Sequence, residues 1–187
     1  MISFKSVKSS RITISELMLP SHTNFSGKIH GGYILSLLDQ IAFACASKYS
    51  GNYCVTASVE TVDFLNPIEV GELVTLKACV NYVGKSSMII GIRVESENIQ
   101  TGKINHCNSS YFTMVSKNEK GNSVQVPTLL LNNFEDIRRF YYGLKIIQTR
   151  KEKQQHESIF DFKSENALLN LKNYNVLVEL KQNNNLK

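Results

Sequence analysis

The sequence predicts an α+β fold in which an antiparallel sheet wraps around one long helix. One amphipathic helical segment lies in the first third of the chain, and four strand-like runs follow it in succession. A helix with one apolar stripe and a sheet with one apolar face bury those surfaces against each other. The order of the elements therefore indicates two layers around a single core.

A short strand is predicted before the helix, within residues 7–18. Apolar and polar side chains alternate from Arg11 to Ser15, which is the period of a strand with one buried face. Pro20 ends this strand, and residues 21–28 are rich in the small polar side chains that are typical of a loop.

The clearest helix follows this loop. Its apolar residues recur at the spacing of one helical face: Ile34, Leu37, Leu38, Ile41, Ala42 and Cys45. Gly31-Gly32 precedes the helix and Gly51-Asn52 follows it. The window holds about 16 to 18 helical residues, or about 25 Å of helix.

Four strands are predicted after the helix, at residues 54–64, 73–83, 87–96 and 104–116. In the second, Val74 and Leu76 fall on one side and Thr75 and Lys77 on the other. Turn signals separate the runs, so we expect neighbouring strands to pair as an antiparallel meander.

The C-terminal part is predicted to be a basic, helical extension. Pro127 closes the sheet-forming unit, which gives a domain over residues 1–130 and an extension over residues 131–187. Asn133 suits the N-cap of a helix from about Phe134 to Lys153. The predicted apolar stripe of this helix consists of Ile137, Phe140, Tyr141, Leu144 and Ile147, and residues 158–180 carry enough apolar side chains for a further helix or two.

Composition argues against several classes of protein. Residues 1–135 hold 11 Lys and Arg against 10 Asp and Glu, whereas residues 136–187 hold 10 against 6, an excess too small to indicate nucleic-acid binding. No apolar stretch is long enough to span a membrane, and the N-terminus lacks the apolar core of a signal peptide. The four cysteines stand singly, without the spacing of metal ligands, which favours buried free thiols in a reducing compartment. We therefore expect a soluble, cytoplasmic protein without a metal or other cofactor.

Asp39 is the first candidate for chemistry, because it lies inside the predicted helix among apolar side chains. A carboxylate that is buried without a partner has a raised pKa, in the range that is useful to a general base. The alternative is a structural aspartate that pairs with a cation or caps a backbone group. The position of Asp39 leaves both interpretations open.

The turn His30-Gly31-Gly32 and the loop residue Asn24 are the second and third candidates. Two glycines at a helix start permit close backbone approach, and the first amides have no partner inside the helix. Such a turn can hold a carbonyl oxygen that gains negative charge in a tetrahedral intermediate. The alternatives are a plain glycine-rich turn with a structural His30, and an Asn24 that closes its own loop.

Together, these residues resemble the acyl-CoA hydrolases of the hotdog superfamily. The pattern is Asn24, then His30-Gly31-Gly32, then Asp39, followed by the meander. Further matches lie in three later segments and at the end of the sheet-forming unit: Val62 to Pro67, Val83 to Met88, Tyr111 to Val115, and Val126-Pro127. The resemblance covers about residues 10–127.

This resemblance implies a hotdog fold, an acyl-CoA thioesterase activity and subunits that pair edge to edge. Sites in this family lie between two subunits, so Asp39 of one chain is expected to face Asn24 of the other. A trimer of such dimers is also expected. Asp39 then serves as general base or as nucleophile, while amides of the His30-Gly31-Gly32 turn polarise the thioester carbonyl and Asn24 positions the water or the carbonyl.

By the same resemblance, Gly84, Lys85, Ser86 and Ser87 approach the phosphates of CoA, which is part of the substrate. The three residues Gly84-Lys85-Ser86 also occur in P-loops, but the upstream glycine is missing here and strands flank the turn, so we do not expect a P-loop. Two alternative functions keep the fold: a non-catalytic acyl-CoA sensor, and a dehydratase that uses His30 and Asp39. A third alternative is a scaffold whose basic C-terminal helix recruits a partner.

Overall fold

The structure is a computed structural model that describes residues 4–157, 164 and 169–176. The chain divides into two compact units, residues 1–146 and residues 147–187. The first unit contains the sheet, its central helix and the first turns of helix α3 (Phe134–Glu157). In the second unit, the described residues hold the last turns of α3 and a short 3-10 helix, η2 (Leu171–Asn173).

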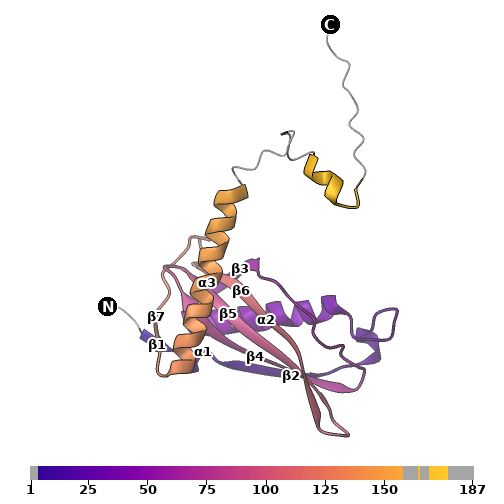
Figure 1. Cartoon of the computed structure of the whole chain (residues 1–187). Helices are drawn as coiled ribbons and strands as arrows, with labels where there is room; N and C mark the ends of the chain where they lie inside the picture. Colours follow the sequence, from indigo (N-terminus) through magenta and orange to yellow (C-terminus); the bar gives the residue numbers. More distant parts are fainter. Residues whose placement is uncertain (1–3, 158–163, 165–168, 177–187) are drawn as a thin grey trace. The chain divides into compact units, whose positions relative to one another are not determined.

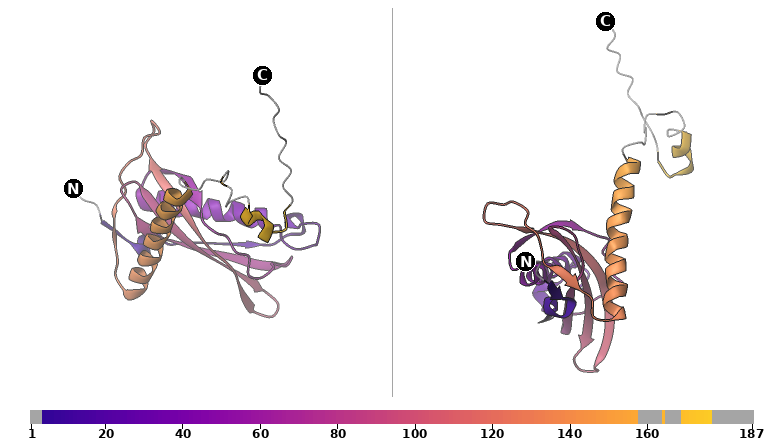
Figure 2. Two further views of the ribbon diagram at one scale, coloured as in Figure 1. Left: turned by 45° about the horizontal axis from the view of Figure 1, so that its top comes forward. Right: turned by 90° about the vertical axis from the view of Figure 1, so that its left-hand side faces the viewer.

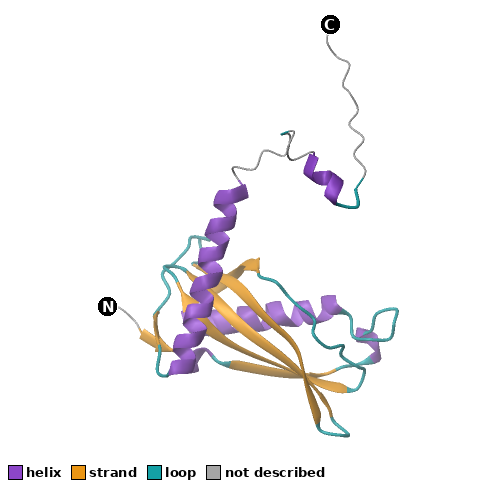
Figure 3. Cartoon of the chain, viewed as in Figure 1, coloured by secondary structure: helices purple, strands orange, loops and turns teal. Residues whose placement is uncertain are grey.

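A curved sheet of five antiparallel strands, in the order β2-β4-β5-β6-β3, wraps around helix α2 (Figures 1 and 3). The elements are β2 (Ile12–Leu17), α2 (Gly31–Ser50), β3 (Tyr53–Val59), β4 (Glu72–Val83), β5 (Ser87–Asn98) and β6 (Lys103–Lys117). Strands β4, β5 and β6 form the predicted meander. The prediction that β3 joins this meander beside β4 is wrong, because β3 pairs with β6 at one edge of the sheet and β2 pairs with β4 at the other. The α+β arrangement that the sequence predicts is therefore confirmed.

The core lies between α2 and the concave face of the sheet. All six residues of the predicted helical face are buried there, against alternate residues of the central strands such as Leu76, Ile90 and Met114. Gly51 ends α2 in the left-handed conformation with φ 75°, and its backbone N–H donates to Ser47 O at 2.8 Å. Because a side chain at φ 75° is strained, the glycine stops the helix where the sequence predicts its end.

The first turns of α3 cover the opposite face of the sheet from α2 (Figure 2). A Cβ on Gly143 would lie 2.7 Å from Tyr82 Cβ, so this glycine lets the helix approach β4 closely. Phe140 packs against Tyr82 with ring centroids 5.2 Å apart. Tyr141, however, is 65% exposed, so the predicted stripe is only partly correct. The buried side of α3 runs through Asp136, Phe140 and Gly143, whereas Tyr141 points away from the sheet.

The N-terminal segment differs from the single strand predicted over residues 7–18. It forms a one-turn helix α1 (Val7–Ser10) before β2, because the Ser6 side chain caps this turn by accepting from Ser9 N at 3.3 Å. A small parallel sheet between β1 (Phe4–Ser6) and β7 (Thr128–Leu130) was not predicted. The short helix η1 (Pro20–His22) also lies in the expected loop.

The remaining predictions concern the C-terminus and the cysteines. Asn133 caps α3, with its Oδ1 accepting from Asp136 N at 2.9 Å, as predicted. The further helix expected within residues 158–180 falls largely outside the described residues. All four cysteines are free and buried, and burial raises the pKa of the Cys45 thiol to about 12. Among the described residues, no helix is both long and apolar enough to span a membrane.

Candidate active site

Asp39 lies on the side of α2 that the sheet does not cover. The Thr56 hydroxyl, on the edge strand β3, donates to Asp39 Oδ1 at 2.6 Å. Asp39 is exposed in the single chain, so the expectation of a carboxylate buried without a partner is wrong for this chain. The sheet wraps only the face of α2 that carries Ile34, Leu38 and Ile41, and Asp39 lies outside that face.

Exposed apolar side chains lie on the same two elements as Asp39 and Thr56. Leu35 and Phe43, one helical turn before and one after Asp39, are each 39% exposed. Tyr53 and Val59, at the two ends of β3, are 63% and 46% exposed. An exposed apolar patch of this kind around a polar pair is typical of a contact surface or a binding groove.

Thr56 was not recognised from the sequence. The pairing of β3 with β6 shifts register between Thr56 and Ser58, which leaves Ala57 as the extra residue of a bulge. Bulges re-aim side chains and are common beside active sites. The run Thr56-Ala57-Ser58 of small residues inside an otherwise apolar strand was the available signal.

His30 caps the N-terminus of α2. Its Nδ1 accepts from Gly32 N at 2.9 Å, and its carbonyl oxygen accepts from Tyr33 N at 3.0 Å. His30 N itself donates to His22 O at 2.8 Å. Among the described residues, Gly31 N is then the one amide of the His30-Gly31-Gly32 turn for which no acceptor is found. The turn therefore offers a single free donor at the positive end of the α2 dipole.

The two glycines of this turn differ in what a side chain would meet. A Cβ on Gly32 would lie 2.7 Å from His30 Cε1, whereas a Cβ on Gly31 would lie 3.4 Å from the half-exposed Phe64 ring. We expect Gly32→Ala to displace the His30 ring and to lower the free energy of unfolding by ~1–2 kcal/mol through loss of the cap. Gly31→Ala should stay within ~0.5 kcal/mol. Denaturant unfolding at one protein concentration measures both, and equal losses would contradict this account of the cap.

Asn24 closes its own loop in the single chain, which was the alternative interpretation of this residue. Its Oδ1 accepts from Ser26 N at 2.9 Å, from Ser26 Oγ at 2.7 Å and from Lys28 N at 3.2 Å. The loop belongs to the N-terminal end of α2, and Asp39 lies eight residues, or about 12 Å, along the helix from Gly31. One chain therefore does not bring Asn24 and Asp39 together.

The turn Gly84 to Ser87 joins β4 to β5. Two carbonyl groups of this turn already accept backbone hydrogen bonds: Ser86 O accepts from Ser116 N at 2.9 Å, and Lys85 O accepts from Val126 N at 3.0 Å. The Lys85 side chain is exposed. Ser87 pairs with Val115 on β6, and Val115 pairs with Val55 on β3. Because Val55 precedes Thr56, the turn lies about two strand spacings, ~10 Å, from the residue beside Thr56. Within the part of the chain that the structure describes, no group of three His, Cys, Asp or Glu side chains is arranged to hold a metal ion.

Comparisons with known proteins identify similar chains. Residues 26–103 match the family model described as the thioesterase superfamily. Protein VdlD of Helicobacter pylori is 42% identical over 135 residues, which cover 72% of this chain and 77% of VdlD. A crystal structure of an apo-hexameric acyl-CoA thioesterase has 33% identity and a TM-score of 0.79, and the match covers 82% of this chain and 98% of that one.

An acyl-CoA hydrolase from Staphylococcus aureus, solved with butyryl-CoA, CoA and CoA disulfide, is also similar. It has 27% identity and a TM-score of 0.76, over 83% of this chain and 94% of that one. Three further structures of this enzyme carry single substitutions to alanine, of an asparagine, an aspartate and a threonine. In that sequence the aspartate follows the asparagine by 15 residues, and the threonine follows the aspartate by 17.

Proposed function

This chain belongs to the thioesterase superfamily as an acyl-CoA hydrolase, and we propose that it hydrolyses acyl-CoA to a fatty acid and CoA with Asp39 as general base. The observation that carries this proposal is the Thr56 hydroxyl held 2.6 Å from Asp39 Oδ1 on an open face of α2. This contact leaves Oδ2 free to accept a proton from water. Asn24, Asp39 and Thr56 also have the spacing of the three residues replaced in the Staphylococcus aureus enzyme.

The proposed reaction is a direct attack of water on the thioester. Asp39 takes a proton from the water, and the oxygen attacks the carbonyl carbon. The carbonyl oxygen becomes negative and accepts a hydrogen bond from Gly31 N, at the start of α2. The C–S bond then breaks, and the proton passes from Asp39 to the leaving thiolate of CoA. A single oxyanion donor of this kind is typically worth ~10²–10³ in kcat.

Thr56 acts in this proposal as a positioning residue. Its hydroxyl also lies 3.4 Å from Met114 Sδ, on the neighbouring strand. Anchored in β3, the hydroxyl fixes one carboxylate oxygen of Asp39 and thereby the direction of the other.

We expect Thr56→Val to lower kcat by ~10–100-fold, because a hydrogen bond to a charged group contributes ~1.5–3 kcal/mol. Thr56→Ser retains the hydroxyl and should keep most of the activity. Steady-state kinetics on one acyl-CoA compares the two variants. If Thr56→Ser lost as much kcat as Thr56→Val, the strand geometry and not the hydrogen bond would carry the effect.

We propose that a second copy of the chain completes the site. β3 is an edge strand, so the outer side of its backbone is open to another strand. Phe64 and Leu65, which follow β3, are 50% and 57% exposed, and Phe25 at the tip of the Asn24 loop is fully exposed. A two-fold pair along β3 would cover these side chains and bring Asn24 of one chain toward Asp39 of the other. The hexameric relative supports a trimer of such dimers.

The CoA part of the substrate is proposed to lie against the turn Gly84 to Ser87. Lys85 is an exposed cation that binds phosphate as a point charge. Ser87 Oγ lies beside Gly84 and offers a hydroxyl donor at the same turn, while Gly84 N already donates to Ser87 O at 2.8 Å. We also retain two proposals from the sequence: a thioesterase domain over residues 1–130 with a basic extension over residues 131–187, and a cytoplasmic location.

Release of free thiol from short-chain and long-chain acyl-CoA tests the proposed function. Thiol release with at least one chain length supports the thioesterase. Saturable CoA binding without release at any chain length would favour the sensor, and conversion of 3-hydroxyacyl-CoA to enoyl-CoA would favour the dehydratase. The two alternatives are thus separated from the proposal in one set of assays.

A further inference from the structure

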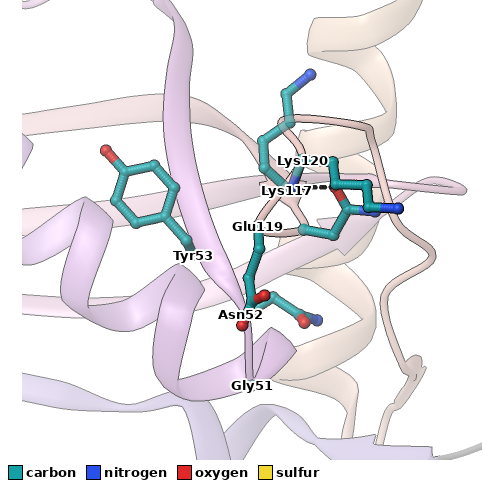
Figure 4. Close-up of a pocket in the computed structure, with 7 residues that line it drawn as sticks. Gly51, Asn52, Tyr53, Lys117, Glu119 and Lys120 are labelled. Carbon is teal, nitrogen blue, oxygen red and sulfur yellow. Dashed lines mark hydrogen bonds between the residues drawn. The ribbon is translucent and has the colours of Figure 1, made fainter.

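A large open pocket lies where α2 ends and β3 begins. It has a volume of about 720 Å³, and residues 51–53 line it on one side and residues 117–120 on the other. Figure 4 shows Tyr53 on one side of this pocket and Lys117, Glu119 and Lys120 on the other. The mechanism above uses none of these side chains.

This pocket adjoins both parts of the proposed site, the Asp39 side and the turn proposed for the CoA phosphates. Tyr53 precedes Thr56 by three residues on β3, or about 10 Å along the strand. On the other side, Lys117 follows Ser116, whose N–H donates to Ser86 O at 2.9 Å in the turn proposed for the CoA phosphates. The extended pantetheine arm of CoA is longer than the separation of Tyr53 from Thr56. A substrate with its thioester at Asp39 therefore extends as far as the pocket.

The charges of the pocket suit an anion. Lys117 and Lys120 are two cations, and Glu119 is the single carboxylate among the lining residues. The Lys117 ammonium is oriented by Ser123 Oγ at 3.1 Å, whereas Lys120 is exposed. Lysine ammonium groups bind phosphate as point charges, so the pair is suited to a terminal phosphate group.

The Tyr53 side of the pocket suits a purine base. Tyr53 is 63% exposed and its ring is held by an edge contact with Phe43, at 5.6 Å between centroids. A held and exposed aromatic face is a stacking platform for a base. Three of the last four carbonyl groups of α2 already accept hydrogen bonds within the chain, so the Tyr53 ring is the part of the wall that recognises the base. These bonds join Ser47 O to Gly51 N, Tyr49 O to Lys5 Nζ and Ser50 O to Asn52 Nδ2.

We infer that this pocket binds the 3′-phosphoadenosine end of CoA, with Lys117 and Lys120 on the 3′-phosphate and Tyr53 against the adenine. The inference rests on the proposed function, because it extends the substrate from the site at Asp39. It assigns separate anchors to the two phosphate groups: the turn Gly84 to Ser87 takes the pyrophosphate, and the two lysines take the 3′-phosphate.

The test compares acyl-CoA with acyl-3′-dephospho-CoA and acyl-pantetheine on the intact enzyme. The double variant Lys117→Ala/Lys120→Ala should raise KM for acyl-CoA by ~10-fold, a tenfold change in affinity, and leave KM for both truncated substrates unchanged. kcat should stay within ~2-fold, because the pocket is remote from the reacting carbon. Tyr53→Ala should raise KM for acyl-CoA and acyl-3′-dephospho-CoA but not for acyl-pantetheine.

Lys103→Ala is the matched control, since Lys103 is an exposed lysine at the opposite end of the same strand. An unchanged KM for acyl-CoA in the double variant would overturn the inference. An equal rise with acyl-3′-dephospho-CoA would also overturn it, because the lysines would then not act on the 3′-phosphate.

Failure of the proposed function gives a different result, namely no thiol release by the wild-type enzyme. In that case equilibrium binding of CoA and 3′-dephospho-CoA still tests the pocket. The wild-type chain should prefer CoA, and the double variant should lose that preference. Equal binding of CoA by both proteins would overturn the inference.

Discussion

Asp39→Asn is expected to lower kcat by at least ~10²-fold on every acyl-CoA that the enzyme turns over, because a general base is typically worth ~10²–10⁴ in rate. The substitution preserves shape, and the amide oxygen still accepts the hydrogen bond from Thr56. It removes only the ability to take a proton from water. KM should change little, since the carboxylate contributes mainly to the transition state.

The structure supplies a clear control for this variant. Asp39 is exposed in the single chain and Asn preserves the acceptor for Thr56, so the replacement should leave the free energy of unfolding nearly unchanged. Gln40→Ala changes the next exposed residue of the same helix and should keep wild-type kcat. If Asp39→Asn retained near-full activity on all chain lengths, Asp39 would have no part in the mechanism.

The fold was predictable because most of it is encoded in local patterns. The apolar face of α2, from Ile34 to Cys45, follows from residue spacing alone, and Gly51 marks its end. The central strands alternate apolar and polar residues, so their inner faces were also predictable. Segments without a repeating apolar pattern were harder to predict. The turn of α1 depends on a single Ser6 cap, and β1 pairs with β7 across more than 120 residues of chain.

The candidate site was only partly predictable, for two physical reasons. The spacing of Asp39 places it next to the apolar face of α2, but spacing does not show how far around the helix the sheet reaches. The exposure of Asp39 is therefore a property of the fold. Thr56 meets Asp39 through a bulge in β3, and a register shift is set by pairing with β6 instead of by the strand sequence. For Asn24, the sequence left open a turn-closing role, and that role is the one the single chain displays.

The proposed division of the active site between two chains follows from what one chain leaves incomplete. Asp39 is open to solvent on α2, and Asn24 is held in a separate loop by its own hydrogen bonds. If the two residues act together only across a dimer, then each chain contributes Asn24 to one site and Asp39 to the other. Asn24→Ala and Asp39→Asn would each inactivate both sites of a dimer made from one variant alone.

Mixed dimers of these two variants show whether the active site is shared between chains. A dimer with one chain of each kind contains one site with both native residues and one site with neither. Random pairing makes about half of the dimers mixed, so refolding or co-expression of equal amounts should restore about a quarter of the wild-type kcat per chain, as two-fold symmetry requires. Activity no higher than the mean of the two separate variants would contradict a site shared between chains.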